Sequence, residues 1–227
     1  MAFHATPAPQ CGTAPMRQSI ALQAIPTLAS PIADRSLAER FASMVTGESV
    51  NFNLIRDGVE HRRIFGSVAV ALRQVVQNIN RETGEIYMDW DASMSISLNL
   101  ESLVSSLGEL NPEEQAAICT AKLNGNQTFP MLVARHASGA TGALLDIISG
   151  MDTNTRAAIF TAQNSDSQTF PMCVAEGTLG YAPEVTEKFF NAVNGLGARI
   201  QANVFTAQDN SNQTLAMLIA RHARGAT

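Results

Sequence analysis

One segment of this chain occurs three times, and no other feature constrains the fold as strongly. The copies are Ala117–Arg135, Ala158–Glu176 and Asn203–Arg221. Gln127, Gln168 and Gln213 occupy the same place in each copy, so the spacings are 41 and 45 residues. Recurrence at such a period is typical of arrays in which each unit buries its apolar face against its neighbours. We therefore expect a helical repeat solenoid over residues 101–227.

Each copy is predicted to form two helices joined by a polar loop, then a glycine turn and a third helix. In the first copy the expected elements are the helix Glu113–Lys122, the loop Leu123–Thr128, the helix Pro130–Ala137, the turn at Gly139 and the helix Gly142–Gly150. Asn111 is an N-cap residue, Pro112 suits the first helical position, and Asp152 opens the equivalent helix of the second copy. Thr128 and its register mates are expected to cap the second helix of each copy.

Residues 1–35 differ in composition from the rest of the chain. They hold five of the nine prolines and only three charged residues, Arg17, Asp34 and Arg35. Dense proline removes backbone donors and interrupts helices and strands, which predicts a disordered leader. No basic region precedes an apolar stretch, so the leader is not a secretory signal peptide. Two interpretations remain, a linker or tail and an uncleaved secretion signal.

Residues 36–100 are predicted to form a small α+β unit. Ser36 fits the N-cap of a helix through Met44, and Val59–Asn80 carries apolar residues at helical spacing. Strands are expected at Ser49–Ile55, Glu85–Trp90 and Met94–Leu100. The last of these alternates apolar and polar side chains, as a half-buried strand does.

Charge and composition argue against several classes of protein. A net charge of -5 does not suit a nucleic-acid-binding protein, which needs clustered cations for phosphate. No run of 18 apolar residues is present, so no membrane span is expected. The three cysteines are an odd number without the spacing of a metal site. We therefore expect no disulfide framework, no metal and no other cofactor.

The candidate nucleophiles are better explained as core residues. Cys119 shares its register position with Phe160 and Phe205, and Cys173 replaces a leucine, so both thiols are expected to be buried. His136 and His222 share a position without a third ligand in register, which indicates a structural role. No catalytic residue is predicted.

The sequence Gln127-Thr-Phe-Pro-Met-Leu-Val-Ala134 resembles the Thr-Pro-Leu-His-x-Ala signature of ankyrin repeats, and residues 138–145 are similar to the ankyrin glycine turn and second helix. Two departures stand out. An extra residue, Phe129 or Phe170, separates threonine from proline, and the period exceeds the ankyrin period of about 33. A HEAT- or armadillo-like repeat, with a period of about 40–47, fits the spacing better but lacks this turn.

The ankyrin-like array and the charge-poor leader together resemble type III-like effector proteins that bacteria secrete into host cells. This resemblance implies a host protein as partner and signal-peptide-independent secretion into the host cell; without that route the chain is expected to be cytoplasmic. It also implies that residues 1–35 carry the secretion signal and bind a secretion chaperone. The third copy stops at Thr227, before its third helix, so we expect a natural chain that continues.

Two functions from different classes follow from this reading. The first is a non-catalytic scaffold that binds a partner protein through the loops and the adjoining helix face. The residues expected at that surface are Asn124, Asn126, Gln127, Arg135, Asp166, Gln168, Glu176, Asn210, Gln213 and Arg221. The alternative is an effector enzyme whose catalytic residues lie in 36–100 or beyond the chain end, with the repeats used for targeting.

Overall fold

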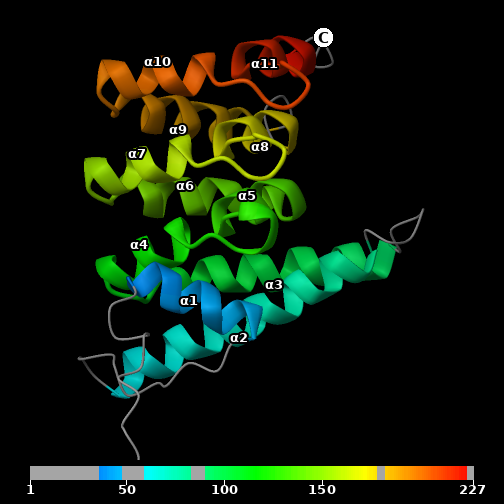
Figure 1. Cartoon of the computed structure of the whole chain (residues 1–227), viewed down its shortest axis with the longest axis vertical. Coiled ribbons are helices and arrows are strands. Elements are labelled where there is room, and N and C mark those ends of the chain that lie inside the picture. The colour runs from blue at the N-terminus through cyan, green and yellow to red at the C-terminus, as the bar shows by residue number, and fades with distance from the viewer. Residues whose placement is uncertain (1–35, 48–58, 83–89, 178–181, 224–227) are drawn as a thin grey trace, which may run out of the picture. The chain divides into compact units, whose positions relative to one another are not determined.

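The computed structural model describes residues 36–47, 59–82, 90–177 and 182–223, all of which belong to one compact unit that comprises residues 31–227. The described residues form eleven α-helices and no β-strand (Figure 1). The prediction of a mainly α fold is therefore confirmed. The expected leader and the expected strand Ser49–Ile55 lie outside the described residues, as does Glu85–Trp90 except for its last residue.

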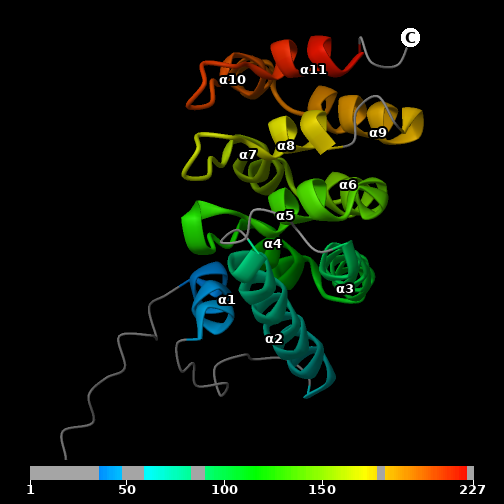
Figure 2. The ribbon, with the colours of Figure 1, turned by 90° about the vertical axis from the view of Figure 1, so that its right-hand side faces the viewer.

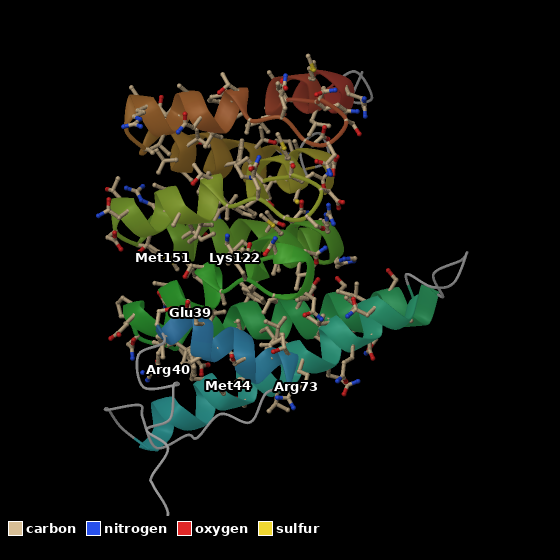
Figure 3. All side chains as sticks on the ribbon, in the orientation of Figure 1. Glu39, Arg40, Met44, Arg73, Lys122 and Met151 are labelled. Carbon is tan, nitrogen blue, oxygen red and sulfur yellow. The ribbon has the colours of Figure 1, made fainter. Side chains whose placement is uncertain are left out.

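Three helices precede the copies: α1 (Leu37–Thr46), α2 (Val59–Glu82) and α3 (Trp90–Gly108). Helix α1 begins where the sequence predicts, because Ser36 and Glu39 form a capping box that satisfies backbone N–H groups of the first turn. Its other end is tied to α2, since the Arg73 guanidinium donates to the Met44 carbonyl with Nε 3.0 Å from the oxygen (Figure 3).

Helix α3 contradicts the strand expected at Met94–Leu100. Ile96 and Leu100 are buried, whereas Met94 and Leu98 are 48% and 58% exposed. The alternating apolar residues therefore divide between two faces of one helix, and only residues four apart share a face. The same buried face continues through Leu103, Val104 and Leu107, so packing over the whole helix outweighs a period of two over seven residues. The α+β character expected for residues 36–100 is not found in their described part.

In the described part of the three copies, the helices follow one another in the predicted order. The first comprises α4 (Pro112–Thr120), the 3-10 helix η2 (Asn124–Asn126), α5 (Phe129–His136), the 3-10 helix η3 (Ser138–Ala140) and α6 (Thr141–Ser149). The second comprises α7 (Thr153–Thr161), α8 (Phe170–Gly177) and α9 (Pro183–Asn194). The third comprises α10 (Ala198–Thr206) and α11 (Leu215–Ala223).

The predicted helix starts at Asn111 and Asp152 are confirmed. Asn111 Oδ1 accepts from the Glu114 N–H at 2.9 Å, and the Glu114 carboxylate accepts from the Asn111 N–H. Asp152 Oδ1 accepts from the N–H groups of Asn154 and Thr155. Each cap satisfies backbone donors that have no partner within the helix, and thereby sets where the helix begins.

Equivalent helices of successive copies lie against one another in three columns. Figure 2 shows α4, α7 and α10 in one column, α5, α8 and α11 in the next, and α3, α6 and α9 on the side away from the loops. Helix α1 packs on α4, and α3 packs on α5, so the N-terminal helices cover the first copy. The predicted boundary at residue 100 lies inside α3, and one continuous hydrophobic core joins the residues on both sides of it.

Candidate functional site: the loop edge

The loops that join the first two helices of each copy lie one above another and share one construction. We call residues 123–128, 164–169 and 209–214 the loop edge. In each loop the first residue donates its backbone N–H to the carbonyl of the marker glutamine: Leu123 to Gln127 at 2.8 Å, Asn164 to Gln168 at 3.0 Å and Asp209 to Gln213 at 3.1 Å. Asn126, Ser167 and Asn212 hold positive φ at the same register position. Asparagine tolerates this left-handed conformation better than most residues.

Backbone hydrogen bonds also connect each loop to the next. The Ser165 N–H donates to the Gly125 carbonyl at 2.7 Å, and the Asn210 N–H donates to the Asp166 carbonyl at 3.0 Å. These two bonds join equivalent positions, and we call them the loop ladder. At Gly125, φ is +67° and an added Cβ would lie 3.4 Å from the Ser165 hydroxyl, which accounts for glycine at this position.

The side chains of the second and third loops strengthen this arrangement. Asn164 Oδ1 and Asp209 Oδ1 each accept two backbone N–H groups of their own loop at 2.8–2.9 Å. Ser167 Oγ donates to Asn210 Oδ1 at 2.8 Å, and Asn210 Nδ2 donates to the Ser165 carbonyl at 3.3 Å. The loop backbones are thus held by contacts within each loop and between loops.

The predicted surface residues divide into an exposed group and a half-buried group. Those with exposed side chains are Asn124, Asn126, Asp166, Asn210 and Arg221. Those with half-buried side chains are Gln127, Arg135, Gln168, Glu176 and Gln213.

Three members of the half-buried group form one polar chain across two copies. The Arg135 guanidinium donates to Gln168 Oε1, and Gln168 Nε2 donates to both oxygens of the Glu176 carboxylate, at 3.2 and 3.3 Å. Arg135 and Glu176 occupy the same register position in α5 and α8, and the glutamine of the second loop lies between them. These three side chains therefore bind one another, and they are less accessible to a partner than the exposed group.

The loop threonines do not act as predicted. The Thr128 and Thr169 side chains are buried, and neither hydroxyl has a hydrogen-bond partner among the described residues. Only Thr214 resembles a cap, with its hydroxyl accepting from the Met217 N–H at a long 3.4 Å. Stacking of the loops on the helix columns removes the threonines from solvent, and the hydroxyls of the first two copies do not reach an N–H of the following helix.

The predicted core columns are buried in all three copies, with one exception. The buried residues are Ile118, Ile159 and Val204, then Leu132, Cys173 and Leu218, and also Met131 and Met172. Met217 was expected to point inward but is 56% exposed. Helix α8 packs on α5 and α11 packs on α8, whereas no described helix packs on the far side of α11.

Both described thiols are core residues, as predicted. Cys119 and Cys173 are fully buried. Burial raises the pKa of the Cys173 thiol to about 11, and burial also raises the pKa of Cys119. The thiolate is the reactive form, so neither residue has the environment of a nucleophile. Burial, and then the Arg135 charge, lower the pKa of His136. The side chain of His222 is outside the described part.

The structure adds a pocket beside the first loop that the sequence did not indicate. Its volume is about 200 Å³. The lining residues come from α2, the first loop and α5, and they are Val76, Ile79, Asn80, Leu123, Asn124, Gly125, Gln127 and Leu132. The pocket depends on how the end of α2 lies against the loop, and no local sequence pattern encodes that contact.

Within the described ranges, no group of three or more His, Cys, Asp or Glu side chains could hold a metal ion. None of the helices in the described part combines the length and hydropathy that crossing a membrane requires. Comparisons with protein-family models, curated proteins and solved structures gave no match.

Proposed function

We propose that this protein is an interaction scaffold that binds a partner protein through its loop edge. The observation that carries this proposal is the loop ladder, which presents exposed polar side chains from three consecutive loops on a backbone fixed by hydrogen bonds. A surface that is ordered before binding loses less conformational entropy when a partner docks, which favours affinity. Stacked repeats commonly bind partners through such an aligned edge.

We further propose that the array is a divergent ankyrin-like solenoid and that its partner is a host protein met after bacterial secretion. The three helix columns support the first part, because equivalent helices pack on one another at each step. Two resemblances support the host protein as partner. The turn sequence resembles ankyrin repeats, and residues 1–35 resemble the leaders of secreted effectors. A charge-poor edge, with Asp166 as its one exposed acidic side chain at the predicted positions, favours a partner surface that is polar and hydrogen-bonding.

A pair of charge-matched variants of the full chain tests the role of the loop edge. Asp166→Lys with Ser211→Lys changes two exposed residues at equivalent loop positions. Glu187→Lys with Asn191→Lys makes the same change in net charge on the exposed face of α9, in the column away from the loops (Figure 2). Each protein is used as bait in a eukaryotic cell lysate, and the captured proteins are quantified by mass spectrometry.

The proposal expects proteins that the unmodified chain and the α9 variant capture equally, and that the loop-edge variant loses. Capture of the same proteins by all three baits would contradict a role for the loop edge. Failure of the unmodified chain to enrich any protein over a bead control would contradict the scaffold itself.

A further inference from the structure

The loop ladder leaves one backbone donor without an acceptor at its start. Ser165 and Asn210 donate their N–H groups to the carbonyl of the preceding loop. The register mate of these residues in the first loop is Asn124, and no described residue accepts from its N–H. Asn124 is exposed, and its backbone N–H is a strong hydrogen-bond donor, so this position is suited to a carbonyl that comes from elsewhere.

The pocket lies at this same place. Gly125 turns its carbonyl towards the second loop, so the opposite side of the first loop faces α2, which is where Val76, Ile79 and Asn80 line the pocket. In the second and third copies the equivalent side of the loop is covered by the preceding loop. The pocket therefore occupies the position that a preceding loop would fill.

The chemistry of the lining indicates what kind of group fits. The apolar lining residues are Leu123 and Leu132, which are only 6% and 1% exposed, together with the half-buried Val76 and Ile79. The polar lining side chains are Asn80, Asn124 and Gln127, none of which carries a charge. Charged ligands lack a counter-charge here, whereas a neutral group with one apolar side chain and a hydrogen-bonding backbone is complementary.

The volume of the pocket limits the size of the occupant. Pockets for drug-sized molecules span about 300–1,000 Å³, whereas this one measures about 200 Å³. It is large enough for an anchoring side chain but not for a large cofactor. Because the neighbouring loops fill equivalent sites with polypeptide backbone, the observations favour a peptide over a small metabolite.

We propose that this pocket binds a short, uncharged peptide segment of a partner protein, with a backbone carbonyl accepting from the Asn124 N–H and an apolar side chain on Leu123 and Leu132. The bound segment extends the loop ladder by one step, and backbone hydrogen bonding with a side-chain pocket is an established mode of peptide recognition. This inference rests on the proposed scaffold function and specifies one partner contact within it.

Two substitutions at Asn124 separate the backbone donor from the side chain. Asn124→Pro removes the N–H, and the site tolerates proline because Asn124 is the first residue of η2 and the preceding Leu123 is extended, with φ −91° and ψ −170°. Asn124→Ala removes the same side chain but keeps the N–H. Comparison of the two variants therefore isolates the hydrogen bond.

The experiment selects a displayed library of random heptapeptides against the full chain and measures the affinities of the enriched peptides by fluorescence anisotropy. We expect Asn124→Ala to change affinity by less than about threefold and Asn124→Pro to weaken it about five- to tenfold, the effect of one typical hydrogen bond. The enriched peptides should share an apolar residue flanked by uncharged ones.

An NMR titration of the unmodified chain gives a second measurement that does not depend on how the variants fold. The Asn124 amide proton should shift downfield as peptide binds, whereas that of Ser165, which is already bonded, should stay in place. Failure to enrich any peptide, equal binding by Asn124→Pro and Asn124→Ala, or a shift at Ser165 without one at Asn124 would each overturn the inference. The Asp166→Lys, Ser211→Lys protein should bind these peptides normally, so failure of the wider scaffold proposal remains distinguishable from failure at the pocket.

Discussion

Met172 and Met217 occupy the same register position but contribute differently to the fold. Met172 is fully buried in α8, against which α11 packs, whereas Met217 on α11 is 56% exposed. We expect Met172→Ala to lower the free energy of unfolding by about 2–4 kcal/mol, since it removes a long apolar side chain and leaves a cavity. Met217→Ala is the matched control and should cost no more than about 1 kcal/mol. Urea denaturation of both variants measures the difference, and equal losses would contradict the packing described here.

His136 should make stability depend on pH in a defined direction. Burial and the adjacent Arg135 charge lower its pKa in the folded chain below the ordinary value near 6.5. As pH falls through 6.5, the unfolded chain takes up a proton that the folded chain does not, so stability decreases towards acid. Well above pH 6.5, His136 is neutral in both the folded and the unfolded chain, so it does not contribute to the pH dependence of stability.

The comparison between the unmodified chain and His136→Gln tests this effect. The difference in unfolding free energy between pH 7.5 and pH 5.5 should be smaller in the variant, because glutamine does not titrate. An unchanged pH dependence in the variant would show that His136 titrates alike in both states, and a steeper one would show that folding raises its pKa instead of lowering it.

Helix starts could be predicted from the sequence because they depend on neighbouring residues. Ser36, Asn111 and Asp152 accept from N–H groups two or three residues ahead, so the cap lies within one short segment. The element at Met94–Leu100 could not be predicted in this way, because seven alternating residues fit a strand as well as about two turns of helix. Only the continuation of the buried face of α3 to Leu107 distinguishes a helix from a strand here.

The cap of α4 provides a test at the scale of a whole helix. Asn111→Ala should cost about 1 kcal/mol of unfolding free energy, because the Glu114 N–H loses its acceptor. Asn111→Asp keeps an acceptor and adds a negative charge near the helix N-terminus, so its effect should stay within a few tenths of a kcal/mol. Thermal unfolding of the two variants measures both changes in unfolding free energy. An equal loss in both would mean that the cap does not set the helix start.

At the scale of the whole molecule, the period of the repeat predicted which elements recur but not how the copies touch. The bond from Ser165 to Gly125 and the chain from Arg135 through Gln168 to Glu176 join residues more than thirty positions apart. Their geometry follows from the rotation between successive copies, which the spacing of 41 and 45 residues does not specify. The pocket depends in addition on α2, which has no counterpart in the other copies.

The columns also predict how protection against exchange varies through the molecule. Ala134, Ala175 and Ala220 are register mates in α5, α8 and α11, so the same residue type reports on each step of one column. Helix α5 lies between α3 and α8, and α8 lies between α5 and α11. Helix α11 contacts α8 and α10, and no described helix packs on its other side. Ala134 and Ala175 are accordingly buried, and Ala220 is exposed.

Local opening costs least free energy where the fewest apolar contacts are lost, so we expect the Ala220 amide to exchange at least about tenfold faster than that of Ala134. Valine precedes Ala134 and isoleucine precedes Ala220, so the intrinsic exchange rates of the two amides are closely matched. Hydrogen exchange followed by NMR, at a concentration where the protein is monomeric, gives the ratio directly. Met172→Ala provides a further check, because loosening the contact between α8 and α11 should speed exchange at Ala220 more than at Ala134. Equal protection of Ala134 and Ala220 in the monomer would mean that α11 is held by contacts other than those with α8 and α10.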